Sequence, residues 1–311
     1  MSISRTSILK FCARLLLYFA VFALAYTLFI AFFGKTAMLE QTVNYPLAGG
    51  GHMLSRMRDA DTCENVDIVF VGSSHTYRGF DNRIFAKYGY SSFNLGSSNQ
   101  TPMQYEVLLK RFLSQMNPRY VVIEVNPEAF EMDGIESSLD LIANYGVDFP
   151  VICMALKSCN MKAINTAIYG LYADHILHDK RFVAEPAISG ADCYVSGGFV
   201  ARDSVPFKYK NPIRRNFEIR NSQRTAFENS LKFLSENNVK VLLVEAPVMR
   251  VYYDSYANHD EFADYMMTKG MYFDFNNPQI VPDYMFYDLE HMYQSGVELF
   301  DSLFVTKCLP K

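Results

Sequence analysis

Five short runs of apolar residues recur along the middle and the C-terminal part of this chain, and each has the length of a buried β-strand. The first run is interrupted only by Asp67 and is ended by Gly72. Runs of this kind are typical of parallel strands that are covered on both faces. The predicted strands are residues 66–71, 90–95, 120–125, 239–245 and 271–275.

Between these strands, apolar residues recur at the three- and four-residue spacing of amphipathic helices. The best two stretches are 103–115, with Val107 and Phe112, and 220–237, with Phe227. Because strands and helices alternate, we predict a three-layer α/β/α fold with a mostly parallel sheet and helices on both faces. In such folds the functional site lies at the C-terminal ends of the strands.

One region, residues 130–212, does not show this alternation. More than eighty residues without regular structure would be unusual in a compact domain. We therefore predict a helical insertion that covers the site, with residues 152–177 as its main helical segment. The α/β domain is expected to extend from 66 to 306, followed by a short tail at 307–311.

A separate apolar run lies near the N-terminus. Residues 15–33 carry no charge, and this length suffices to cross a bilayer and exceeds the roughly 7 to 15 apolar residues of a typical signal peptide. Arg5, Lys10 and Arg14 precede the run and only Lys35 follows it closely, so residues 1–14 are expected in the cytoplasm. We predict a single-pass anchor at 15–34, a linker at 35–65 and an extracytoplasmic domain. A cleaved signal peptide is the alternative.

The overall composition conceals this division. The chain has 311 residues, of which 50% are hydrophobic and 20% charged, and this excludes a disordered chain. Four of the 29 basic residues precede Glu40, the first acidic residue, so the remainder carries 25 basic against 33 acidic residues and a net charge of about −8. An acidic body argues against a nucleic-acid partner, because phosphate binding needs clustered Lys and Arg.

The cysteines show neither a compact disulfide framework nor metal-binding spacing. Cys12 borders the apolar run. For Cys153 and Cys159 two interpretations are open: they form a disulfide, or they are free buried thiols. The other three are Cys63, Cys193 and Cys308.

Small polar residues follow three of the predicted strands. The turn after 66–71 places Ser74 at the edge of the sheet, where its hydroxyl is a candidate nucleophile; the alternative is an ordinary turn or helix cap. Gly96 follows 90–95 and is able to bring a backbone N–H close to an oxyanion, and Asn126 follows 120–125 with a side-chain amide. A turn glycine and a turn-capping asparagine are the alternatives.

A further candidate pair lies between the last predicted strand and the apolar C-terminal stretch. Asp288 precedes His291 by three residues, so one turn can hold both side chains together. The carboxylate would orient the imidazole while its other ring nitrogen faces a serine. The position after the last strand places the pair at the edge of the sheet where Ser74 is expected.

Together these four blocks resemble the SGNH/GDSL hydrolase superfamily. Within it, the chain is most similar to the membrane-anchored branch that includes the D-alanyl transfer protein of teichoic acid synthesis and the alginate O-acetyltransferases. The matching motifs are Gly72-Ser73-Ser74, Asn94-Leu95-Gly96, Val125-Asn126-Pro127 and Asp288-Leu289-Glu290-His291, within residues 66–130 and 220–306.

The resemblance implies a flavodoxin-like fold and acyl transfer through an acyl-serine. Ser74 would be the nucleophile, His291 the base and Asp288 its orienting carboxylate. The oxyanion hole would consist of the Ser74 and Gly96 backbone N–H groups and the Asn126 side chain. Two positions depart from the family pattern: Ser73 stands where aspartate is commonest, and Val-Asn-Pro-Glu replaces Gly-x-Asn-Asp in the third block.

The expected substrate is an acylated envelope or secreted glycan, or a small acyl ester, and the acceptor is water in an esterase or a hydroxyl in a transferase. No cofactor and no metal is expected, and a membrane-bound O-acyltransferase is an expected partner in the transferase case. A non-catalytic assembly or glycan-binding subunit with the same fold is the alternative function.

Four other features are less specific. His175 and His178 have a spacing that can chelate zinc, but no third ligand is evident. His75 follows the candidate nucleophile and is expected at the edge of the site; a role in assisting catalysis is the alternative. Glu124 faces either the site or a basic neighbour. The tyrosines near the fourth block offer sugar stacking or ordinary packing: 252, 253, 256, 265, 272, 284, 287 and 293.

Overall fold

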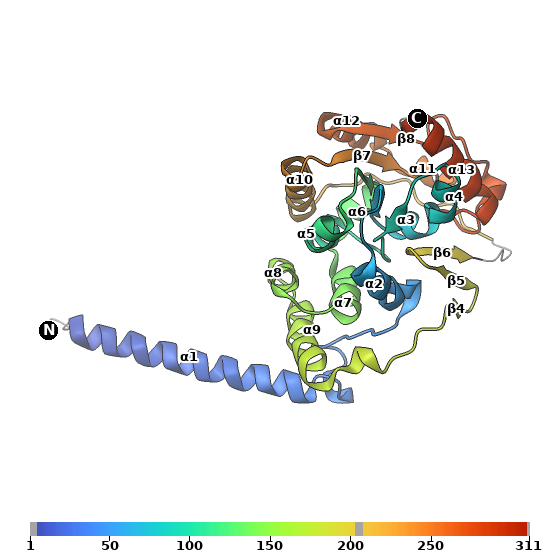
Figure 1. The fold of residues 1–311 in the computed structure, drawn as a ribbon. Helices are drawn as coiled ribbons and strands as arrows, with labels where there is room; N and C mark the ends of the chain where they lie inside the picture. Colours follow the sequence, from blue (N-terminus) through green and yellow to red (C-terminus); the bar gives the residue numbers. More distant parts are fainter. Residues whose placement is uncertain (1–4, 203–207, 310–311) are drawn as a thin grey trace.

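The main sheet has five parallel strands in the order β2-β1-β3-β7-β8 (Figure 1). The computed structural model describes residues 5–202 and 208–309. Each strand lies inside the range predicted for it, so all five predictions of strands are confirmed. The strands are β1 Ile68–Val71, β2 Ser92–Asn94, β3 Tyr120–Glu124, β7 Lys240–Glu245 and β8 Met271–Asp274.

Helices cover both faces of this sheet, because successive strand residues point to opposite sides. Val69 and Val71 of β1 pack into one core with α5, α10 and α12, whereas Ile68 and Phe70 pack into a second core with α4 and α13. The predicted three-layer α/β/α fold is therefore confirmed. The covering helices are α4 Asn82–Lys87, α5 Pro102–Met116, α10 Asn221–Glu236, α12 His259–Lys269 and α13 Gln294–Cys308.

The helices predicted at 103–115 and 220–237 correspond to α5 and α10. Thr101 begins α5 with a reciprocal cap, in which its backbone N–H donates to Gln104 Oε1 at 2.9 Å, and Pro102 occupies the first turn. Shorter helical segments follow β1, β3 and β7 or precede α13: α3 Ser74–Gly79, α6 Pro127–Glu131, α11 Arg250–Tyr253 and η5 Asp283–Met285. Residues 307 and 308 belong to α13, so the predicted tail is shorter than expected.

The inserted region contains helices and also a small antiparallel sheet, β4-β5-β6, which we did not predict from the sequence. The helix predicted at 152–177 is broken at 158–160, because Asn160 caps a new helix by accepting the Lys162 N–H at 2.9 Å. The elements are α7 Ile135–Asn144, α8 Phe149–Lys157, α9 Met161–Tyr172, η3 Ala173–Leu177, η4 Asp179–Arg181, β4 Ile188–Ser189, β5 Asp192–Val195 and β6 Phe199–Arg202.

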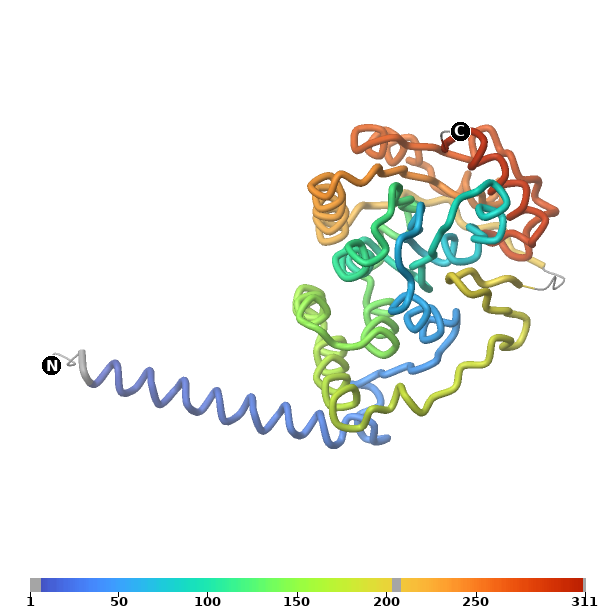
Figure 2. The backbone as a smooth tube through the Cα atoms, viewed as in Figure 1, coloured from blue at the N-terminus to red at the C-terminus, as the bar shows by residue number. Residues whose placement is uncertain are grey.

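The helices of the insertion do not form the expected cover over the site. They pack against α1, α2 and α5, and the trace in Figure 2 shows them between α1 and the main sheet. The part of the insertion that packs on α3 is β6. The β5–β6 hairpin, rather than the helices, therefore borders the strand ends.

The N-terminal helix α1, Arg5–Phe33, leaves the body on one side (Figure 1). Its 27 residues from Ser7 to Phe33 are long and apolar enough to cross a membrane, and few of them are buried in the protein.

The predicted linker at 35–65 is wrong, because most of it is folded onto the body. It contains η1 Ala37–Leu39, η2 Gly50–His52 and α2 Met53–Thr62. Met53, Met57 and Ala60 of α2 lie in the same core as α5, and the fully buried Arg56 donates from Nε to the Gly198 carbonyl at 3.1 Å. The six cysteines are free, so Cys153 and Cys159 are not bridged.

Candidate active site

Ser74 lies at the C-terminal end of β1, where the chain turns sharply into α3. Gly72 has φ +142°, and a side chain there would place Cβ 2.4 Å from Thr76 Oγ1 and 2.8 Å from Glu124 Cβ. Only glycine fits this position without displacing its neighbours. Ser73 then caps α3 by accepting the His75 N–H at 3.3 Å. This turn leaves Ser74 half-buried as the first residue of α3.

Asp288 and His291 are held together by a tight turn before α13. Asp288 Oδ1 accepts the backbone N–H groups of Glu290 at 2.8 Å and His291 at 2.7 Å, and Oδ2 lies 2.8 Å from His291 Nδ1. A carboxylate only accepts, so Nδ1 carries a proton and, in a neutral imidazole, Nε2 is the acceptor. The turn therefore fixes both the orientation and the tautomer of His291.

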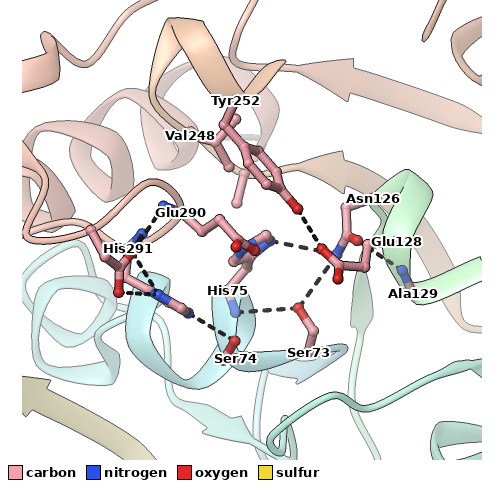
Figure 3. Close-up of polar contacts among 12 residues, drawn as sticks. Ser73, Ser74, His75, Asn126, Glu128, Ala129, Val248, Tyr252, Glu290 and His291 are labelled. Carbon is pink, nitrogen blue, oxygen red and sulfur yellow. Dashed lines mark hydrogen bonds and ion pairs between the residues drawn. The ribbon is translucent and has the colours of Figure 1, made fainter. Parts of the chain in front are cut away.

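The structure brings the two segments together although 217 residues separate them. His291 Nε2 lies 2.8 Å from Ser74 Oγ (Figure 3). Ser74, His291 and Asp288 thus form a continuous hydrogen-bonded chain with the geometry of a nucleophile, a base and an orienting carboxylate.

The three predicted oxyanion donors differ in how they are placed. The Gly96 N–H donates to Asn94 Oδ1 at 3.0 Å, and the Asn126 amide donates to Glu124 Oε1 at 3.0 Å. Ser74 begins α3, so its N–H faces no carbonyl within the helix. The structure therefore leaves the Ser74 N–H as the donor best placed for a negatively charged oxygen.

A second buried network lies directly beside Ser74. His75 is 5% exposed; its Nδ1 lies 3.3 Å from Glu124 Oε1 and its Nε2 lies 3.2 Å from Glu290 Oε2 (Figure 3). Both ring nitrogens face acceptor-only carboxylates, so both carry protons and His75 is an imidazolium ion. Burial lowers the pKa of His75, but the hydrogen bonds to Glu124 and Glu290 outweigh burial and raise it well above the ordinary value.

His75 is therefore not the edge residue expected from the sequence, and Glu124 faces both a basic neighbour and the site. Glu124 Oε2 also accepts the Ser73 hydroxyl at 2.9 Å. Glu124, on the neighbouring strand β3, thus supplies a carboxylate to the turn that holds Ser73 and Ser74. The role of Glu290 was not predicted; the available signal was His75 beside Ser74, because a histidine needs a counter-charge once it is buried and charged.

Burial lowers the pKa of His291 below its ordinary value. The hydrogen bond and charge of Asp288 raise this pKa but do not reverse the shift, and the positive charge on His75, whose ring centroid is 5.4 Å away, lowers it further. Lowering the pKa keeps the imidazole neutral in more acidic solution. A neutral Nε2 is what a general base requires.

We expect the acidic limb of the kcat/KM profile for a small acetyl ester to have its midpoint below about pH 6.5, the ordinary histidine value. In a His75→Gln variant the neighbouring positive charge is lost, so the pKa of His291 rises and the midpoint moves to higher pH. Initial rates measured across the acidic range test both statements. An unchanged midpoint in the variant would show that His75 does not act on His291.

The β5–β6 hairpin forms one edge of the site. Arg78 of α3 makes two hydrogen bonds to Asp192, at 3.0 and 2.7 Å, and Arg202 lies over the Tyr287 ring at 5.0 Å from its centroid. Tyr287 in turn stacks on His291, with ring centroids 5.7 Å apart and planes at 11°. The hairpin is thus connected to His291 through one aromatic ring.

Most of the tyrosines near the fourth block bond to side chains of the protein rather than presenting a free sugar-stacking surface. Tyr253 donates to Asp274 at 2.7 Å and Tyr272 to Glu245 at 2.5 Å, and Tyr252 donates to Glu128 (Figure 3). Tyr284 is the exposed member, at 77%. These hydrogen bonds support ordinary packing, and not sugar stacking, as the role of most of these tyrosines.

His175 and His178 lie on the surface in and after η3, beside the ion pair of Lys180 with Asp174. They are not brought near Ser74. Across residues 5–202 and 208–309, no group of three or more His, Cys, Asp or Glu side chains is arranged to hold a metal ion.

Comparison with known proteins identifies no family. No family model and no curated protein matches the sequence. Among solved structures, the chain is similar to a "putative acylhydrolase" from Bacteroides fragilis, at 13% identity and a TM-score of 0.39 over 83% of this chain and 95% of that one. A GDSL-like lipase from Bacteroides thetaiotaomicron is 12% identical, with a TM-score of 0.38 over 89% of this chain and 97% of that one. Because the identities and TM-scores are this low, the function is inferred from the geometry of the site and not from these two structures.

Proposed function

We propose that this protein is a serine esterase or O-acyltransferase of the SGNH/GDSL type that forms an acyl-serine on Ser74. The observation that supports this most is the hydrogen-bonded chain from Asp288 through His291 to Ser74, in which both contacts measure 2.8 Å. Its position at the C-terminal end of β1 is where ligands bind in open α/β sheets.

In the proposed reaction, Ser74 Oγ attacks the acyl carbon of an ester while His291 Nε2 takes its proton. Asp288 stabilises the imidazolium ion that forms, and the Ser74 N–H donates to the tetrahedral oxyanion. His291 then returns the proton to the leaving alcohol as the C–O bond breaks. In the second half, water or an acceptor hydroxyl loses a proton to His291 and attacks the acyl-serine, and His291 gives that proton to Ser74 Oγ as the acyl–oxygen bond breaks, which restores the free serine.

We also propose that α1 is a single-pass anchor with a cytoplasmic N-terminus, so that the site acts outside the membrane. The excess of basic residues before the apolar run supports this orientation. The resemblance and this location together favour ester-linked acyl groups of an envelope or secreted glycan as substrate. A membrane-bound O-acyltransferase is the proposed partner if the acceptor is a hydroxyl.

One observation favours the non-catalytic alternative. The Gly96 N–H and the Asn126 amide, both expected in the oxyanion hole, already donate to Asn94 and Glu124. A subunit that keeps the fold without turnover would tolerate such an arrangement.

A serine-reactive fluorophosphonate separates the two functions. We expect it to label the purified full-length protein, because His291 activates the Ser74 hydroxyl, and to leave Ser74→Ala unlabelled. A Ser98→Ala variant is the matched control, because Ser98 lies at the neighbouring strand end and bonds Tyr77 Oη at 3.1 Å instead of His291. Labelling is read by gel fluorescence. Folded wild-type protein that takes up no label would favour the non-catalytic subunit.

A further inference from the structure

Helix α8 is apolar around almost its whole circumference, yet the protein covers only one side of it. Val151, Met154 and Ala155 are buried, whereas Phe149 and Leu156 are 76% and 56% exposed. A helix that is apolar all round normally lies in a protein core or in a membrane. The uncovered side of α8 therefore needs a partner that is itself apolar.

This helix is held beside the N-terminal apolar helix through α9. Tyr26 of α1 donates to Asn165 of α9 at 2.8 Å, and Phe32 contacts Tyr172 with ring centroids 5.4 Å apart. Both pairs lie near the C-terminal end of α1, where α9 crosses it (Figure 1). Tyr26 lies seven residues before Phe33, the last residue of α1, which is about 10 Å along a helix axis.

If α1 crosses a bilayer with its apolar run, this contact places Asn165 of α9 at the level of Tyr26, near the outer interface, and Figure 1 shows α8 on the side of the body from which α1 extends. Interfacial helices bury their apolar face by roughly 5–10 Å into the boundary between headgroups and acyl chains. Met161, the first residue of α9, is 59% exposed and adds to the apolar surface. Lys157 and Lys162 flank the α8–α9 connection, where their side chains can extend to lipid phosphates.

We propose that the exposed apolar side of α8, formed by Phe149 and Leu156 together with Met161, docks into the outer interface of the membrane that α1 spans. This proposal rests on the proposed anchor and goes beyond it, because one helix alone leaves the domain free to tilt. Two contacts with the same bilayer fix the domain's orientation and hence the height of Ser74 above the surface.

Tryptophan fluorescence tests the docking directly, because the chain contains no tryptophan of its own. The full-length protein is reconstituted in vesicles of phosphatidylcholine and phosphatidylglycerol, with or without phosphatidylcholine brominated along its acyl chains. Leu156→Trp reports on α8, Leu24→Trp on the apolar run, and Tyr284→Trp on η5, where Tyr284 is 77% exposed. These are surface positions, so the fold tolerates the larger ring.

We expect brominated lipid to lower the emission of Leu156→Trp and Leu24→Trp by about twofold or more, and to leave Tyr284→Trp unchanged. Quenching of Leu24→Trp alone would overturn the docking and leave the anchor standing. Quenching of neither variant would overturn the anchor and the docking together. A blue-shifted Leu156→Trp emission without quenching would identify a second protein chain, not lipid, as the partner, and would also overturn the proposal.

Discussion

Replacing His291 by alanine is expected to lower kcat for hydrolysis of a small acetyl ester by roughly 10⁴- to 10⁶-fold. The variant keeps Ser74 and its N–H but removes the imidazole nitrogen 2.8 Å from Ser74 Oγ that is proposed to take its proton. Since the serine hydroxyl is a weak nucleophile at its own pKa, little acyl-serine forms without a base. The remaining rate would come from binding and the oxyanion donor alone.

Asp288→Asn should cost roughly 10⁴-fold in kcat, because an amide at this position can donate to Nδ1 and stabilise the wrong tautomer of His291. Steady-state kinetics with wild-type protein as reference give both values. His175→Ala is the matched control, since His175 is an exposed histidine of the insertion that is not near Ser74. A His291→Ala variant that kept more than about a tenth of the wild-type kcat would exclude this residue as the base.

Replacing Glu124 by glutamine is expected to lower the free energy of unfolding by about 3–5 kcal/mol, the range found when one partner of a buried ion pair is removed. Glutamine has nearly the same shape, so the change removes the charge and leaves the packing. Glu124 has a fully buried side chain, and that of His75 is 4% exposed, so little solvent screens the loss. The expected decrease in Tm is roughly 6–20 °C.

The pH dependence of this difference follows from the two pKa shifts. Burial raises the pKa of Glu124, but the hydrogen bond and charge of His75 outweigh it and lower that pKa, so the stabilisation by Glu124 is lost as pH falls through its folded value. The pKa of His75 is raised, so its stabilisation is complete below about pH 6.5 and is lost as pH rises through its folded value. The difference between wild type and Glu124→Gln should therefore be greatest between about pH 4.5 and 6.5.

Thermal unfolding of the solubilised full-length protein at several pH values measures these differences. Glu290→Gln is the natural comparison, because Glu290 contacts the same imidazole but its side chain is 31% exposed. Solvent screening should reduce its effect to about 1 kcal/mol. Equal losses in the two variants at every pH would contradict a buried His75–Glu124 pair.

The strands of the main sheet were predictable because each lies in an apolar run that is long enough to be recognised from its own residues alone. The residues at the strand ends could be predicted for the same reason, since parallel strands bring their C-terminal ends to one edge. Ser74 and the Asp288–His291 turn were identified by their positions relative to strands. The short distance between Ser74 and His291 depends on how α13 docks onto the body. For that docking the sequence offered only the order of the elements along the chain.

Other features depend on tertiary contacts that no local pattern records. The strands β4, β5 and β6 have two to four residues each, too few for a visible period. The direction of the Glu124 carboxylate and the pairing of Glu290 with His75 are decided by packing between segments far apart in the chain. Helix α2 was overlooked because the glycines at 49–51 suggested a linker, although its apolar residues follow a helical spacing.

The separation of 217 residues between Ser74 and His291 also has a consequence for biosynthesis. Asp288 and His291 follow every strand of the main sheet in chain order, whereas the apolar helix precedes them all. If α1 is the proposed anchor, a growing chain reaches the membrane first and acquires its proposed base only when the segment around α13 has emerged and docked. In the proposed mechanism Ser74 has no base to activate it until then, so the order of synthesis would keep the unfinished chain from reacting with esters.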